Sequence, residues 1–513
     1  MNSNAAVGAR GGTDRDSLVI ACFWLLMASS FFVLKEPAPF DLAFIVVFSL
    51  SMLFGLQVPK RLVFLILLLG GFLLFGLIGT SQSNVQEHYQ ESIRHVQITG
   101  LLVAVALFVA CFIYRYQERA LTAMMNGWVV AAVLASLAGI AGYFDLLGSY
   151  SEHFTLYGRA KGTFKDPNVL APFLVPPALY CVYHAASRSA FWSLFNLGVL
   201  LILVLGLLLT FSRGGWAHFA VSAVLAGVLW LVYVKDRRFR SRLIGFAIIA
   251  GGVLTFAVLT LLSMESVGDL FAQRFRIQEY DSSASGRFAG QYLTAMKVLD
   301  FPLGLGSHGF LPDWFEQPHN VYLFQFVIAG WGGGLLYLAI VVATLVRGVA
   351  LLNRATPLAG IIVVLVASFA GLALEGFIVD SDHWRHFYFL LGAIWGLVAI
   401  YETPARYPVP VRREPPPDPN PARPQMPMSP PEPKAVPAPA PVSAPPVSID
   451  VPLRRAHAPE VDLTPTPEPA PPPRPAPPPP AQPVAPEPQY RIVPPSPPSP
   501  PAPEALGLRG TVE

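Results

Sequence analysis

Residues 191–216 read FWSLFNLGVLLILVLGLLLTFSRGGW, a long uncharged run that ends in an arginine followed by two glycines. A helix needs about 20 apolar residues to cross the hydrocarbon core of a bilayer, and residues 191–210 supply them. Arg213 then lies where hydrocarbon meets water, a position in which a charged side chain is costly unless a partner or ligand compensates it. The stretch therefore predicts a membrane-spanning helix with a functional charge at its mouth.

The same pattern recurs along most of the chain. Hydrophobic residues make up 53% of the sequence and charged residues 13%, whereas about a quarter of the residues in a soluble domain are charged. The net charge of +3 comes without a basic run, so nucleic-acid binding is not expected, and the three cysteines all fall in apolar stretches. We therefore expect an all-α, polytopic transmembrane helix bundle of about 12 spans. The predicted spans are residues 17–34, 40–56, 62–79, 96–114, 121–143, 168–185, 191–210, 216–234, 243–262, 320–346, 358–379 and 386–401.

Lysine and arginine decide the orientation, because short cytoplasmic loops carry an excess of them. With a cytoplasmic N-terminus, residues 1–16, the inside loops hold most of the positive charges, including the basic run at 235–242. An even number of spans then leaves both termini cytoplasmic. The membrane domain is predicted to cover residues 17–402 and to include one long periplasmic loop, residues 263–319.

The composition changes abruptly near residue 403, where proline and alanine begin to dominate. Such a segment cannot bury enough apolar surface to offset the entropy lost on ordering. Residues 403–513 are therefore predicted to form a disordered, Pro-rich cytoplasmic tail. The alternative is that its PxxP repeats bind a cytoplasmic partner.

Positive residues on the predicted outside are the exception, and an anionic ligand would account for them. Gly214 and Gly215 allow a tight re-entry whose backbone N–H groups lie at a helix N-terminus beside Arg213, an arrangement that can cradle a phosphate. The alternative for Arg213 is a snorkelling side chain at the interface. For the cations of segment 158–168, a solvated loop and a contact with lipid phosphate remain equally open. The outside cations are Arg159, Lys161, Lys165, Arg213, Arg274, Arg276 and Arg287.

His319 and Asn320 stand where the long loop re-enters the membrane. A histidine can be neutral near pH 7 and accept a proton from a hydroxyl, and Asn320 can orient a sugar or the imidazole. Asp380 and Asp382, in an outside turn, can pair with the cations or orient His319. The alternatives are a structural histidine and an ordinary polar turn.

Two further strings predict local structure. Asp166-Pro-Asn168 is typical of a turn and helix N-cap at the start of the span that follows. Gly330-Trp-Gly-Gly333 provides a small-residue face inside the span 320–346, which favours close packing against another helix.

In their order and spacing, four strings resemble motifs of the O-antigen ligase and polymerase family of polytopic glycosyltransferases. They are Gly158-Arg-x-x-Gly-Thr-Phe-x-Asp-Pro-Asn168, Ser212-Arg-Gly-Gly215, Ser285-Gly-Arg287, and His319-Asn320 followed by Gly330-x-x-Gly333. The resemblance covers roughly residues 17–401 and leaves out the tail. It implies an enzyme of the bacterial inner membrane that transfers a glycan from a polyprenyl diphosphate carrier to an acceptor sugar hydroxyl, with its active site on the periplasmic face.

The resemblance also implies roles for the polar residues. Arg213 and His319 would be catalytic, the arginine stabilising the diphosphate leaving group and the histidine deprotonating the acceptor. The implied partners are a polyprenyl diphosphate-linked glycan donor, a glycan or lipid A-core acceptor, and the lipid bilayer. We expect neither a cofactor nor a metal, because no His/acid cluster stands out on the outside. Donor binding would fall to Arg159, Lys161, Arg287, Gly214 and Gly215, and orientation or support to Asn320, Asp380 and Asp382.

Three alternatives stay open from the residues. A ligase attaches the glycan to a lipid A-core sugar, and a polymerase of the same family attaches it to another carrier-linked repeat unit by the same chemistry. A polysaccharide-lipid transporter or flippase would need ionisable residues along a central path and repeated halves, neither of which stands out here. An envelope-assembly scaffold would act through the Pro-rich tail.

Overall fold

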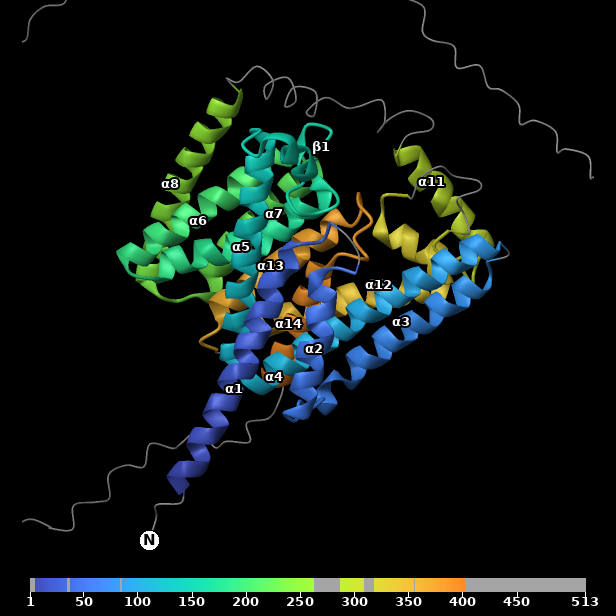
Figure 1. Ribbon diagram of the computed structural model, residues 1–513, viewed down its shortest axis with the longest axis horizontal. Coiled ribbons are helices and arrows are strands. Elements are labelled where there is room, and N and C mark those ends of the chain that lie inside the picture. Colours follow the sequence, from blue (N-terminus) through green and yellow to red (C-terminus); the bar gives the residue numbers. More distant parts are fainter. Residues whose placement is uncertain are drawn as a thin grey trace, which may run out of the picture. The chain divides into compact units, whose positions relative to one another are not determined.

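The computed structural model describes residues 5–34, 37–83, 85–262, 287–308, 318–354 and 356–401. Within these ranges the chain is almost entirely helical, with one two-stranded antiparallel sheet of Thr155–Leu156 (β1) and Arg159–Ala160 (β2) (Figure 1). The prediction of an all-α, membrane-type fold is confirmed. The tail from 403 and most of the predicted loop 263–319 lie outside the described residues.

The α-helices are α1 (Ala5–Ala28), α2 (Pro39–Leu53), α3 (Val63–Ser81), α4 (Gln86–Tyr143), α5 (Pro167–Ser187), α6 (Ala190–Leu209), α7 (Arg213–Tyr233), α8 (Arg237–Leu262), α11 (Arg287–Lys297), α12 (Val321–Leu352), α13 (Ala359–Glu375) and α14 (Arg385–Tyr401). Short 3-10 helices link some of them, namely η1 (Ser29–Phe31), η2 (Lys60–Leu62), η3 (Gly148–Phe154) and η4 (Val298–Asp300).

Each predicted span overlaps one of these helices. Among the described residues, six helical segments are long and apolar enough to cross a membrane, and three further apolar helices are shorter. Helix α4 contains two predicted spans, and the backbone breaks between them at Gln117, where φ is 49° and ψ is −126°. The number of 12 crossings therefore stays a prediction. The six segments are Lys60–Ser81, Gln86–Tyr143, Pro167–Ser187, Ala190–Leu209, Arg213–Tyr233 and Val321–Leu352.

Helices far apart in the sequence pack side by side. Helix α14 lies against α4, α12 against α3, and α13 against α7 (Figure 1). Buried tryptophans join such pairs: the indole N–H of Trp230 donates to the Gly360 carbonyl at 2.9 Å, and that of Trp395 donates to the Thr344 hydroxyl at 2.9 Å. An indole buried in an apolar interface needs such a partner, so these bonds fix how the helices are rotated against each other.

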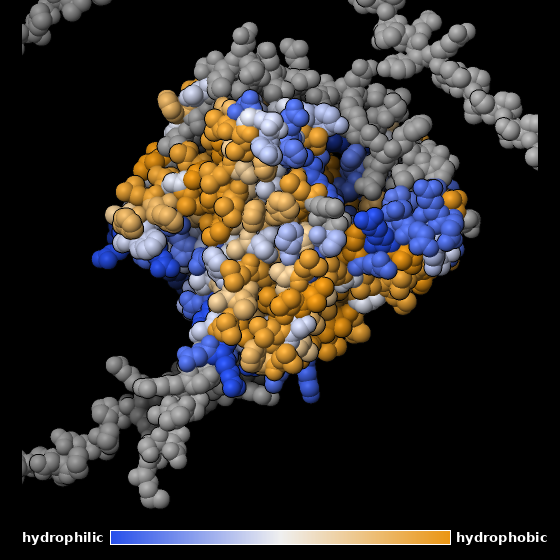
Figure 2. Space-filling model, viewed as in Figure 1, coloured by the Kyte–Doolittle hydropathy of each residue, from blue (hydrophilic) through white to orange (hydrophobic). Residues whose placement is uncertain are grey.

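The surface is largely apolar, as expected for a protein surrounded by lipid. Figure 2 shows this face as mostly hydrophobic, with a large hydrophilic patch where α3 ends and α4 begins and smaller hydrophilic areas elsewhere. Large exposed side chains such as Leu42, Leu67 and Ile248 come from α2, α3 and α8. Water would not tolerate so much contiguous apolar surface on a soluble monomer, and the chain is a membrane protein.

The positively charged connections gather at one end of the helices. Arg242, at the start of α8, donates to the carbonyl of Arg188, after α5, at 2.7 Å. Tyr233, at the end of α7, donates to the amide oxygen of Asn353, after α12, at 3.2 Å. These connections are among those that the lysine and arginine bias assigns to one side, and the contacts bring them to the same end.

Helix α12 is interrupted at Gly330, where the sequence predicted an unbroken helix. Its φ of 67° and ψ of −171° lie in a region that is open essentially only to glycine. A Cβ on Gly330 would stand 2.3 Å from the Pro302 carbonyl oxygen. That carbonyl accepts the N–H of Trp331 at 2.9 Å. The break therefore lets the segment after α11 reach into the helix, while Gly332 and Gly333 pack on Phe75 of α3.

We expect Gly330→Ala to lower the stability of the folded protein by about 2–6 kcal/mol, the sum of the backbone strain and of the overpacking. The thermal midpoint of the purified protein in detergent measures this loss. Gly100→Ala is the matched control, because its Cβ would meet nothing within 4 Å. Equal midpoints for the two variants would contradict the interrupted helix.

Candidate functional site

The C-terminal end of α13 brings the two predicted catalytic strings together. A Cβ on Gly214, in the first turn of α7, would stand 3.1 Å from Oε1 of Glu375. The next residue, Gly376, accepts the backbone N–H of Val321 at 2.8 Å, in the first turn of α12. Arg213 and His319 flank these contacts in the sequence, so both lie at the same end of the helices. The predicted topology likewise requires Arg213 and His319 to lie on the same side of the membrane.

His319 is held by the carboxylate of Asp380. The backbone N–H of His319 donates to Oδ2 at 3.0 Å, and that of Asn320 donates to Oδ1 at 2.9 Å. The imidazole Nδ1 lies 3.6 Å from the same Oδ2. The φ of His319 is 48°, in the left-handed region. One carboxylate therefore both stabilises an unusual backbone turn and faces the Nδ1 nitrogen of the ring.

Asn320 has a structural task in the same turn. It is the N-cap of α12, and its side-chain oxygen accepts the N–H groups of Tyr322 at 3.1 Å and Leu323 at 3.2 Å. Unsatisfied N–H groups at the start of a helix favour such a cap. The predicted orienting role for the imidazole is therefore taken by Asp380, and the amide of Asn320 fixes the start of the helix.

Helix α11 supports His319 from the other side. The side-chain amide of Gln291 donates to the carbonyl of His319 at 3.1 Å and to that of Phe377 at 3.2 Å. Burial raises the pKa of Asp380 to about 7, the charge of Asp382 adds to this rise, and the two backbone donors and the charge of Arg287 oppose it. The guanidinium of Arg287 is therefore near Asp380, so the structure brings this predicted donor-binding residue to the His319 side of the site.

The turn that carries Arg213 is tightly built. Ser212 is the N-cap of α7, and its hydroxyl accepts the N–H of Gly215 at 3.2 Å. A Cβ on Gly215 would stand 2.3 Å from the Cβ of Ala171, so this glycine lets α7 approach α5 closely. The Gly215 N–H that the sequence assigned to a phosphate is therefore engaged in the cap. Gly214 instead makes room for Glu375.

Arg159 is buried next to this turn, and its side chain links two helices. Its Nε donates to the carbonyl of Thr210 at 2.8 Å, and one terminal nitrogen donates to the side chain of Asn168 at 2.8 Å. The side chain joins the end of α6 to the start of α5, so neither a solvated loop nor a lipid contact describes Arg159. Lys161 follows it and is only partly buried. Asp166 caps α5 by accepting the Asn168 N–H at 2.6 Å, which confirms the predicted N-cap.

A comparison with protein-family models finds one match, described as O-antigen ligase, over residues 197–338. The matched part runs from α6 into α12 and contains Arg213, Arg287, His319 and the Gly330–Gly333 string. Residues 197–338 form an O-antigen ligase domain. Such a domain indicates an enzyme of glycan transfer, of ligase or polymerase type. No curated protein matches the chain.

The second carboxylate of the predicted Asp380–Asp382 pair faces another way. Oδ2 of Asp382 lies 3.2 Å from Nε2 of His95, on α4, and 4.0 Å from Nε2 of His383. Burial by itself raises the pKa of Asp382, but His383 and His95 outweigh it and hold the pKa at about 2. Asp382 was predicted to support His319. In the structure its carboxylate instead contacts His95 on α4. The expectation that no His/acid cluster stands out on the outside did not anticipate this grouping of His95, Asp382 and His383.

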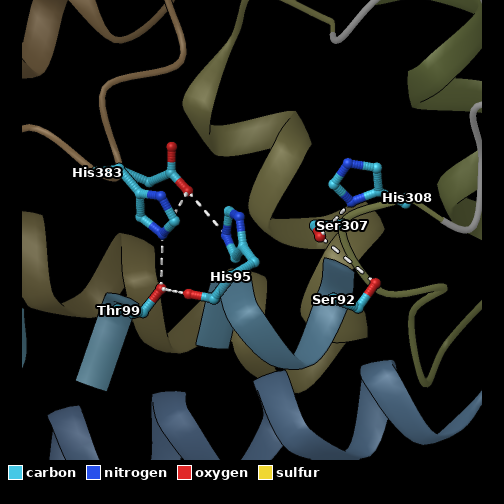
Figure 3. Close-up of polar contacts among 7 residues, drawn as sticks. Ser92, His95, Thr99, Ser307, His308 and His383 are labelled. Atoms are coloured by element: carbon cyan, nitrogen blue, oxygen red, sulfur yellow. Dashed lines mark hydrogen bonds and ion pairs between the residues drawn. The ribbon is translucent and has the colours of Figure 1, made fainter. Parts of the chain in front are cut away.

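The α4 partner of this cluster was missed in the sequence. His88, Ser92, His95 and Thr99 recur at intervals of 4, 3 and 4 residues, which places them on one face of a helix. Figure 3 shows His95 and Thr99 facing His383, and Ser92 facing Ser307. Thr99 and His383 form a 2.9 Å hydrogen bond. A polar stripe on an otherwise apolar helix was the available signal.

A second buried pair lies beneath the Arg213 turn. Nδ1 of His218, on α7, is 2.9 Å from Oε2 of Glu375, and its Nε2 is 3.0 Å from the carbonyl oxygen of Ser368. Both side chains are nearly fully buried. The pair joins α7 to α13 directly below Gly214. It explains why the first turn of α7 cannot shift independently of the end of α13.

Proposed function

We propose that this enzyme transfers a glycan from a polyprenyl diphosphate carrier to the hydroxyl of an acceptor sugar, most simply as an O-antigen ligase. The observation that carries the proposal is the meeting of the Arg213 and His319 turns at Glu375–Gly376. A cationic group and a proton acceptor at one end of the helices fit a reaction in which a diphosphate leaves and a hydroxyl attacks. The O-antigen ligase domain over residues 197–338 supports the same reaction class.

His319 would act as the general base. With Asp380 next to Nδ1, the proton of the neutral ring is favoured on that nitrogen, and Nε2 accepts the proton of the acceptor hydroxyl. The hydroxyl oxygen forms its bond to the anomeric carbon as the bond to the diphosphate oxygen breaks. The electron pair leaves with the diphosphate, the proton stays on Nε2, and the anomeric centre inverts.

Arg213 would stabilise the leaving group. A guanidinium at the N-terminus of α7 adds its charge to the positive end of the helix dipole, where anions are favoured. Arg287 and Lys161 would complete the anion site, and Arg159 would hold the turn in place from below. This proposed chemistry needs no metal in the transfer step, because charge stabilisation and proton transfer are both provided by side chains.

The orientation proposed from the charge bias places this end of the helices in the periplasm of the bacterial inner membrane. Its support is that connections rich in arginine gather at the opposite end, at Arg188 and Arg242. The long loop 263–319 would then be periplasmic, and both termini would be cytoplasmic. The Pro-rich tail, residues 403–513, is proposed to be cytoplasmic.

Purified protein incubated with a carrier-linked glycan and candidate acceptors tests the proposal. Formation of a glycosylated acceptor together with free polyprenyl diphosphate supports it, and the absence of product with every acceptor contradicts it. A ligase is distinguished from a polymerase in cells, because deletion of a ligase leaves long carrier-linked chains and deletion of a polymerase leaves single repeat units.

Asp380→Asn is expected to lower kcat by about 10–100-fold with little change in KM, because the amide no longer favours the proton on Nδ1 of His319. Initial rates at saturating donor measure the effect. An unchanged kcat would remove Asp380 from the proposed mechanism. The neighbouring Ser381→Ala is the control for damage to the turn, because it removes a side-chain hydrogen bond to Tyr337 and leaves the Asp380 carboxylate in place.

A further inference from the structure

We propose that His95, Asp382 and His383 bind one divalent transition-metal ion that fastens α4 to the turn between α13 and α14. The ion would be structural and would hold the turn that carries Asp380. It lies outside the glycan-transfer chemistry proposed above and does not depend on that proposal.

The geometry of the three side chains fits an ion. Each contributes one donor atom, and the three atoms all lie within 4.8 Å of one another. The separations from Asp382 Oδ2 are 3.2 Å to His95 Nε2 and 4.0 Å to His383 Nε2. Tetrahedral ligands bonded to zinc at about 2.0–2.2 Å stand roughly 3.3–3.6 Å apart. Small side-chain movements would therefore complete the site.

The chemistry of the donor set selects the metal. Two imidazoles and one carboxylate suit zinc, cobalt, iron, nickel or manganese, whereas calcium and magnesium prefer oxygen ligands throughout. Three protein ligands leave a fourth position for water or for another side chain. The Thr99 hydroxyl is hydrogen-bonded to His383 Nε2 at 2.9 Å, and an ion bound to that nitrogen would replace this bond.

The surroundings of Asp382 provide a second, independent observation. Its Oδ2 atom is buried and makes no geometrically sound hydrogen bond among the described residues, although two imidazole nitrogens stand near it. Gln325 of α12 is fully buried within hydrogen-bonding reach of this carboxylate, but neither of its amide atoms makes a hydrogen bond of good geometry. Buried polar atoms normally have partners. A cation between Oδ2 and the two nitrogens would satisfy the carboxylate, and Gln325 would then serve as its outer-shell support.

The position of the cluster determines which part of the protein a bound ion would hold in place. His95 lies on α4, and Asp382 and His383 lie in a connection almost 300 residues later in the chain, as the 284-residue separation of Thr99 and His383 illustrates. Asp380, two residues before Asp382, holds the backbone of His319. A metal bond across the cluster would therefore limit the movement of the turn on which His319 depends.

Metal content is measured on full-length protein purified in detergent without a polyhistidine tag. We expect about one equivalent of a transition metal by elemental mass spectrometry. After chelation, titration with Co²⁺ should produce the visible absorption bands of a nitrogen- and oxygen-ligated ion. His95→Asn and His383→Asn should weaken Co²⁺ binding at least about 10–100-fold, the size of effect seen even for outer-shell partners.

His95→Cys separates ligation from folding, because a thiolate is itself a metal ligand and should retain Zn²⁺ where asparagine does not. His153→Asn, a substitution at an exposed histidine of η3, controls for surface histidines. Wild-type protein that takes up neither stoichiometric metal nor Co²⁺ would overturn the proposal. So would a monodisperse His95→Asn variant that binds metal as tightly as the wild type. Neither readout uses glycan transfer, so this proposal and the proposed function can fail separately.

Discussion

Replacing His319 is expected to slow glycan transfer by about 10²–10⁴-fold, the contribution of a well-positioned general base. His319→Asn is the sharper of two variants, because asparagine tolerates the left-handed backbone that His319 adopts with a φ of 48°. Alanine at this position would add backbone strain to the chemical loss. Product formation with the purified carrier-linked donor measures the rate.

The structure supplies the controls for this experiment. In His319→Asn the backbone N–H can still donate to Asp380, so α12 should keep its start and the thermal midpoint should stay near that of the wild type. His153→Ala removes an exposed imidazole from η3 and should transfer glycan at the wild-type rate. A His319→Asn enzyme with wild-type turnover would exclude the imidazole as the base.

Arg213→Ala is expected to reduce transfer by about 10²–10³-fold, as is typical when a group that stabilises developing charge is removed. The loss should fall on kcat, because the diphosphate gains negative charge only as the glycosidic bond breaks. Arg213→Lys should recover only part of the rate, since a point charge lacks the planar fork that binds two phosphate oxygens. Steady-state kinetics on the two variants separate kcat from KM.

A matched substitution at the opposite end of the helices tests whether the effect is local. Arg238, at the start of α8, is exposed. Arg238→Ala removes the same charge from the protein but leaves the proposed anion site intact, so its rate should equal that of the wild type. Similar losses for Arg213→Ala and Arg238→Ala would point to membrane insertion in place of leaving-group stabilisation.

Local strings allowed much of the fold and half of the site to be predicted. Each predicted span overlaps a helix because long apolar runs have few other solutions in a membrane. Arg213 and His319 were singled out as candidates because each is a polar residue next to such a run. The cap at Asp166 follows from a local preference in the same way.

The missed features depend on contacts between distant residues or on backbone geometry. Arg385 donates to both carboxylate oxygens of Asp41, 344 residues earlier in the chain, and no spacing rule links them. His95 and Asp382 are separated in the same manner. The break at Gly330 was missed for another reason: a glycine that opens a helix and a glycine that packs a helix look the same in a sequence.

The contact of Glu375 and Gly376 with the Arg213 and His319 turns limits how this protein can adapt to its bilayer. Glu375 contacts the Arg213 turn and Gly376 contacts the His319 turn. Consecutive Cα atoms are about 3.8 Å apart, so a single peptide unit separates these two contacts. Inserting one residue there would rotate one contact by about 100° relative to the other. Length changes that adapt the protein to a thicker or thinner membrane are therefore expected away from this junction.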